Sequence, residues 1–307
     1  MSVAPCVAAI AFTLCVCQHA AAQACCAGTG VVTPGRLALH EAALVGLQLK
    51  GAAETGSFDN AGKYATLTPG ASELDFEQDV FGALRLTEHA QVALLVPILE
   101  TRRTSNTLSE LGGGLGDTNL NVRYDFTFAG ASKTIPGIGI LAGVTFPTGT
   151  PADSSRIRPL ATDATGIGAF QGSLGLAAEQ VFGPWLVNLT GVVAQRSART
   201  VTQSGITIHE HLAAQWTLLG ALGYVFSNEA ALAFSAAYTV EGDATIDDAD
   251  AVDSNHRSTT LTLAGLVPLS DSWRAQGAAF INPPLSSLSL NQPALAGCSL
   301  TVIHAWL

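Results

Sequence analysis

The sequence predicts an all-β fold, a transmembrane antiparallel up-and-down β-barrel of about 12 strands. Three observations predict it. Many segments carry apolar side chains at every second residue, and the linkers between them alternate between short and long. The chain is also apolar, with a mean hydropathy of +0.34 and 12% charged residues. Beyond the first 24 residues, however, no apolar run approaches the roughly 20 residues that a spanning helix needs.

The segment from 118 to 128 shows the alternation most clearly. Its apolar side chains share one parity and its polar side chains share the other. Successive side chains of a strand point to opposite faces, so this segment has one apolar and one polar face. A membrane barrel turns the apolar face outward, and closing the ring leaves no backbone polar group unpaired in lipid. The apolar set is Leu120, Val122, Tyr124, Phe126 and Phe128.

The same reasoning places twelve strands along the chain. A turn at 87–90 joins the second strand to the third, and Gly183 and Pro184 close a hairpin between the sixth and the seventh. Long polar loops are expected at 51–72, 102–117, 147–168, 241–257 and 282–297. Merging or splitting one hairpin would give ten or fourteen strands. The expected strands are 36–50, 73–86, 91–101, 118–128, 138–146, 169–182, 185–196, 206–226, 232–240, 259–267, 273–281 and 298–307.

Charged residues fix which face of each strand points inward. In the strand 73–86, Asp75, Glu77 and Asp79 oppose the apolar parity, and a slip by one residue would turn all three into lipid. A charge near the bilayer midplane costs up to about 2–4 kcal/mol, and less for carboxylates. We expect the acidic residues to lie opposite Arg123, Arg85 or Arg274 and, with the other inward residues, to determine solute selectivity. Alternatively, they form an ion-pair network that stiffens the lumen. The inward residues are Asp75, Glu77, Asp79, Arg85, Arg123, Asp125, Arg274 and Gln276.

Aromatic residues gather near the predicted strand ends. Amphipathic rings suit the headgroup level, so these residues predict an interfacial girdle. The alternative is a soluble sandwich that packs them in its core. The girdle residues are Trp185, Tyr224, Phe226, Trp273 and Trp306.

The N-terminus predicts export. An apolar stretch and the small-x-small triplet 22–24 indicate a signal peptide at 1–24, although no basic residue precedes Arg36. An alternative is a lipoprotein signal with Cys25 as the acylated residue. A lead-in at 25–35 would precede the barrel at 36–307. Cys25 or Cys26 could pair with Cys298, because the termini of a barrel meet, or the cysteines could be incidental.

Several function classes find no support. A net charge of -10 argues against nucleic acid as a partner. No cofactor or metal is expected: His209 and His211 share a strand face that should point inward near a loop, but a third ligand is missing. The chain contains neither Gly-x-Ser-x-Gly nor His-Glu-x-x-His, so no catalytic residue is assigned.

Two motifs carry a family resemblance. Gly-Leu-Gly-Asp at 114–117 enters the strand with Asn-Val-Arg-Tyr at 121–124, and Gly-Val-Thr-Phe-Pro-Thr-Gly follows at 143–149. The chain thereby resembles the outer-membrane proteins named for the meta-cleavage pathway of phenol degradation. That resemblance implies a channel for hydrophobic small molecules and no catalytic set. One departure is the C-terminus, which ends on Trp306 and Leu307 where many such barrels end on Phe.

Together these observations predict a bacterial outer-membrane channel for passive passage of small hydrophobic or aromatic molecules. Its expected partners are outer-membrane lipid, a small-molecule solute and the barrel assembly machinery, with the oligomeric state left open. The rival hypotheses are a structural or adhesive barrel with a plugged lumen and functional loops, and an outer-membrane hydrolase. The sequence does not identify the solute or the direction of transport.

Overall fold

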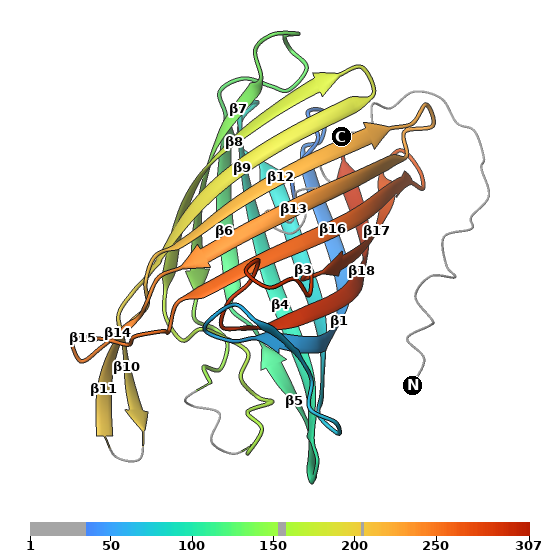
Figure 1. The fold of residues 1–307 in the computed structure, drawn as a ribbon. Helices are drawn as coiled ribbons and strands as arrows, with labels where there is room; N and C mark the ends of the chain where they lie inside the picture. Colours follow the sequence, from blue (N-terminus) through green and yellow to red (C-terminus); the bar gives the residue numbers. More distant parts are fainter. Residues whose placement is uncertain (1–34, 153–157, 204–205) are drawn as a thin grey trace.

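The structure, a computed structural model, describes residues 35–152, 158–203 and 206–307 (Figure 1). The predicted signal peptide, the two adjacent cysteines and the predicted lead-in up to residue 34 lie outside the described residues. Every regular element in the described part is a β-strand. The strands are β1 (Ala43–Phe58), β2 (Tyr64–Thr66), β3 (Ser72–Arg85), β4 (Ala90–Ser105), β5 (Leu108–Leu115), β6 (Thr118–Asp125), β7 (Gly137–Phe146), β8 (Gln171–Phe182), β9 (Trp185–Arg196), β10 (Arg199–Gln203), β11 (Ile206–His211), β12 (Gln215–Val225), β13 (Ala231–Glu241), β14 (Thr245–Ile246), β15 (Ala249–Asp250), β16 (His256–Pro268), β17 (Trp273–Ile281) and β18 (Gln292–Trp306).

These strands form a closed barrel. Fourteen of them belong to one antiparallel sheet whose last strand, β18, pairs with β1 from Ala43↔Trp306 to Phe58↔Gln292. Two of the fourteen, β2 and β5, extend hairpins at one end, and the other twelve complete the ring. The predicted twelve-stranded antiparallel barrel is therefore confirmed.

The two ends of the barrel differ (Figure 1). The turn end carries the short connections 86–89, 183–184, 226–230 and 269–272, and β18 finishes there beside the start of β1. The turn end also carries the longer connection 126–136, whereas the loop end carries the other long connections and a separate four-stranded sheet of β10, β11, β14 and β15. In the described part of the chain, no helix is long and apolar enough to cross a membrane.

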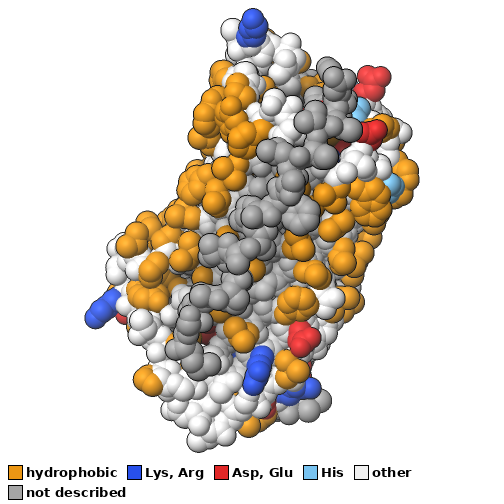
Figure 2. Space-filling view, turned by 90° about the vertical axis from the view of Figure 1, so that its right-hand side faces the viewer, with side chains coloured by type: hydrophobic (Ala, Val, Ile, Leu, Met, Phe, Trp, Pro, Cys, Tyr) orange, Lys and Arg blue, Asp and Glu red, His pale blue; other side chains and the backbone are white. Residues whose placement is uncertain are grey.

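The outer wall is apolar, as the strand parity predicts. On β3, Leu74, Phe76, Val80 and Leu84 are exposed, whereas Asp79 between them is 4% exposed. On the face drawn in Figure 2, hydrophobic side chains make up much of the visible wall on both sides of the grey residues, and charged side chains appear mostly toward its two ends. An apolar band between polar ends is what a lipid bilayer requires of a barrel.

Two predicted strands are corrected at their ends. The first begins at Ala43 and not at Arg36, because residues 36–42 bend into the lumen instead of joining the ladder. The last begins at Gln292 and not at Cys298, because residues 292–297 continue the pairing with β1 beyond a bulge at Glu54 and Gly56.

Two other predictions are wrong at the loop end. The expected continuous strand 206–226 is two strands, and β11 leaves the barrel to pair with β10 and β14. His209 and His211 are therefore exposed outside the ring and do not point inward. The expected loop 102–117 mostly continues the β4 ladder, because β5 pairs with it from Leu108 to Leu115. Local alternation does not show whether a ladder stays within the ring, so it could not detect either departure.

Candidate functional site

A short stretch before the first strand lies inside the turn end of the barrel. We call residues 35–42 the plug segment. Leu37, 4% exposed, packs in a buried apolar cluster with Phe81 of β3 and Ile303 of β18. Its backbone N–H donates to Gln91 Oε1 of β4 at 3.2 Å. These strands follow one another in the ring order β18, β1, β3 and β4, so Leu37 fixes the plug segment to one side of the lumen.

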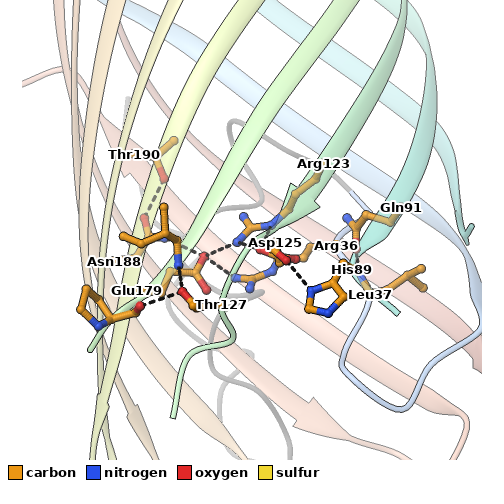
Figure 3. A network of polar contacts seen from close by, with 12 residues as sticks. Arg36, Leu37, His89, Gln91, Arg123, Asp125, Thr127, Glu179, Asn188 and Thr190 are labelled. Atoms are coloured by element: carbon orange, nitrogen blue, oxygen red, sulfur yellow. Dashed lines mark hydrogen bonds and ion pairs between the residues drawn. The ribbon is translucent and has the colours of Figure 1, made fainter. Parts of the chain in front are cut away.

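The neighbouring residue, Arg36, reaches the far side. Arg36 Nη1 lies 2.5 Å from Glu179 Oε1 of β8, five places from β1 in the ring of twelve. Figure 3 shows Arg36 and Arg123 both turned toward this carboxylate. Arg123 Nη2 is 3.2 Å from Glu179 Oε1, and Asn188 Nδ2 donates to the same oxygen at 3.0 Å. Glu179 is 2% exposed, so these donors, and not water, stabilise its negative charge.

A second anchor holds the other end of the plug segment. Glu41, buried, forms an ion pair with Arg274 of β17, and its backbone carbonyl accepts from Arg85 Nε at 2.7 Å. Arg85 also donates to the carbonyl of Ala38. The plug segment therefore ties β17 and β3 to β8 and crosses the lumen at the turn end.

A row of carboxylates follows β3 from the middle of the inner wall to the loop end. Glu73 pairs with Arg103 at 2.8 Å, Asp75 Oδ1 accepts from Thr101 Oγ1 at 2.8 Å, and Glu77 pairs with Lys50 at 2.7 Å. Asp79 is the most buried of the row, and its Oδ1 has no hydrogen-bond partner among the described residues. We call Glu73, Asp75, Glu77 and Asp79 the acidic row.

The structure places the predicted inward residues in two groups. Arg85, Arg123, Asp125 and Arg274 gather at the turn end, where Arg123 also pairs with Asp125 at 2.7 Å. Asp75, Glu77 and Asp79 stay apart from them, so the arginines expected opposite the acidic row bind elsewhere. Gln276 is buried on β17, two residues from Arg274.

Sequence reasoning missed Arg36, Glu41 and Glu179. One signal was present: in a strand 36–50, Glu41 would share the parity of Leu39 and Leu47 and point into lipid. That conflict places the strand start after Glu41. Glu179 lies on the polar parity of its strand, opposite Leu174 and Leu176, and could have been assigned inward by the rule used for Asp79.

The two sequence motifs meet at a clasp beside β5. No strand of the described residues pairs with the edge of β5 that faces away from β4, and Leu160, Thr162 and Thr165 lie there instead. Asp117 accepts from the backbone N–H of Gly149 at 2.9 Å and of Ile167 at 2.6 Å. Thr148 Oγ1 donates to the carbonyl of Gly116 at 2.6 Å, and Thr165 Oγ1 donates to that of Leu115 at 2.7 Å. Asp117 thus holds both ends of the loop 147–168 against the wall.

Replacing Asp117 by Ala should loosen that loop without opening the barrel. Two backbone donors lose their acceptor, which costs about 2–6 kcal/mol at about 1–3 kcal/mol for each unsatisfied donor. Limited proteolysis should cut within 147–168 faster, while far-UV circular dichroism keeps its strand signal. Asp117→Asn retains an acceptor oxygen and should fall between the two. Equal cleavage of all three proteins would show that the clasp does not hold the loop.

The predicted girdle aromatics lie at the turn end. Trp185 and Tyr224 meet at 4.9 Å between ring centroids, and Phe226 is 5.0 Å from Tyr224. Trp273 and Trp306 flank His304, with centroid distances of 4.6 and 4.4 Å. All but Tyr224 are exposed on the outer wall.

A closed antiparallel ring with an apolar outside and a polar lumen is the architecture of outer-membrane β-barrels. In fold, the chain is similar to an outer membrane channel from Pseudomonas putida F1, with a TM-score of 0.72 and 16% identity over 89% of this chain and 97% of that chain. It is also similar to the transport unit of the autotransporter AIDA-I from Escherichia coli, with a TM-score of 0.51 and 7% identity over 92% and 96%. No protein-family model and no curated protein match the sequence.

Proposed function

We propose that this protein is a channel of the bacterial outer membrane through which small hydrophobic or aromatic molecules diffuse. The observation that carries the proposal is the closed ring with an apolar outer wall and charged side chains on its inner wall. The resemblance to the meta-pathway family supports hydrophobic solutes. The turn end would face the periplasm, after export by the N-terminal signal.

In this proposal, the inward residues of the sequence prediction set selectivity and the plug segment limits passage. The proposal involves no reaction. A solute entering from the loop end would pass the acidic row before it reaches the plug segment, because the row lies on the loop-end side of Phe81. Passage past the turn end then requires the plug segment to move.

One observation favours a second candidate. The plug segment crosses the lumen, as a structural or adhesive barrel with working loops would allow. Planar-bilayer recordings of the purified full chain separate the two functions. A channel should give discrete current steps, larger once the plug segment is displaced. A barrel that stays silent in both states would refute the channel and leave the scaffold.

A second measurement addresses the solute. Cells carrying the protein should take up a radiolabelled aromatic hydrocarbon faster than matched cells without it, and an equally small sugar should show a smaller difference. The same uptake with and without the protein would contradict the assignment of hydrophobic solutes.

A further inference from the structure

The acidic row and its surroundings indicate a particular class of ligand, beyond a general preference for cations. Positions two apart on a strand lie about 6.8 Å from one another along the backbone, so the four residues of the acidic row follow a line. Among the described residues, no three His, Cys, Asp or Glu side chains are grouped as a metal ion would need. A line of acceptors suits a ligand with N–H donors better than a compact divalent ion.

The row holds four carboxylates, and two of them pair with a cation. Lys50 and Arg103 pair with Glu77 and Glu73, which leaves Asp75 bonded to the neutral hydroxyl of Thr101. Asp79 has 4% of its surface exposed, and its Oδ1 has no partner in the described part of the chain. A buried carboxylate oxygen without a donor costs free energy, which a cationic ligand would recover.

An apolar row lies directly beside it. In the ladder between β3 and β4, Glu77 pairs with Leu99, Asp79 with Pro97 and Phe81 with Leu95. All of these side chains share the inner parity. A ligand whose cation meets Asp79 would therefore have apolar side chains of the neighbouring strand beside it.

One ammonium group of the protein itself already lies in this wall. Lys50 Nζ, a primary ammonium, lies 2.7 Å from Glu77 Oε2 and 5.7 Å from the ring centroid of Phe280. Ammonium groups are stabilised by carboxylates and by aromatic faces in this way. The oxygen without a partner among the described residues is Asp79 Oδ1, and Asp79 is the next inward residue after Glu77 along β3.

We infer that Asp79 binds the ammonium group of an amphiphilic primary amine whose alkyl chain lies along Pro97 and Leu99. This inference deepens the proposed channel function by naming a solute class, and it rests on that function only for its biological meaning. Asp75 would take the ammonium next as the solute moves toward or from the loop end.

Isothermal titration of the detergent-solubilised full chain with hexylammonium chloride tests the inference. The wild-type protein should bind it saturably, and Asp79→Asn should weaken binding by about tenfold, as expected for loss of one charge-assisted hydrogen bond. Hexan-1-ol, which has the same chain without the charge, should bind at least about tenfold more weakly than hexylammonium. The control Asp271→Asn, an equal charge change on an exposed turn, should leave the affinity unchanged.

If Asp79→Asn fails to fold, Asp75→Asn gives a second measurement on the same row and should weaken binding less. Wild-type protein that binds hexylammonium no better than hexan-1-ol, or Asp79→Asn that binds like wild type, would overturn the inference. The result is separable from channel function. Amine binding without current steps would refute only the channel, whereas current steps without amine binding would refute only the ammonium site.

Discussion

Displacing the plug segment should raise the single-channel conductance severalfold. Leu37→Asp puts a carboxylate among Phe81, Ile303 and other buried apolar side chains, where an unpaired charge costs several kcal/mol. The plug segment can avoid that cost by leaving the wall, since the barrel ladders begin only at Ala43. Conductance of the purified variant in planar bilayers, compared with wild type, measures the effect.

The chain supplies a matched control two residues away. Leu39 is 48% exposed, so Leu39→Asp makes the same chemical change in the same segment without entering the cluster. Its conductance should equal that of wild type. Glu179→Gln should act like a weaker Leu37→Asp, because it removes the charge that holds Arg36. If both Leu37→Asp and Leu39→Asp conduct like wild type, the plug segment does not limit the current.

Neutralising Asp75, Glu77 and Asp79 of the acidic row should change the ion selectivity of the channel. Carboxylates in a confined lumen raise the local concentration of cations by tenfold or more. With Asp75→Asn, Glu77→Gln and Asp79→Asn together, the ratio of K⁺ to Cl⁻ permeability should therefore fall by about tenfold. The reversal potential across a KCl gradient reports this ratio.

Two comparisons make the experiment decisive. The exposed set Asp248→Asn, Asp250→Asn and Asp271→Asn removes the same charge outside the lumen and should leave the ratio near wild type. The effect of the acidic row should also shrink in about 1 M salt, where the screening length is about 3 Å. An unchanged reversal potential at low salt would contradict the proposed role of the row in selectivity.

Much of the wall followed from local alternation. In strands such as β3, every second residue is apolar, and the cost of turning Asp79 into lipid is enough to fix the face. The strand order also followed, because short turns force neighbours to pair. Glu41 was the exception that could have been noticed, since it breaks the parity of the predicted first strand.

The candidate site was only partly predictable. Arg123, Asp125 and Arg274 could be assigned to the inner wall, but Glu179, which binds Arg123, and Glu41, which binds Arg274, are 56 and 233 residues away along the chain. Parity gives the face of a strand and not the angular position around the ring. The arginines expected to face the acidic row therefore turned out to bind at the turn end.

The sequence alone determined that this chain is a two-faced sheet that must close, because a period of two is a property of each strand taken by itself. Only the tertiary structure decided what fills the ring. The plug segment enters the lumen because Leu37 finds apolar neighbours from separate strands and Arg36 finds Glu179 across the barrel. Such contacts exist only once the ring has brought distant strands within reach of one short segment.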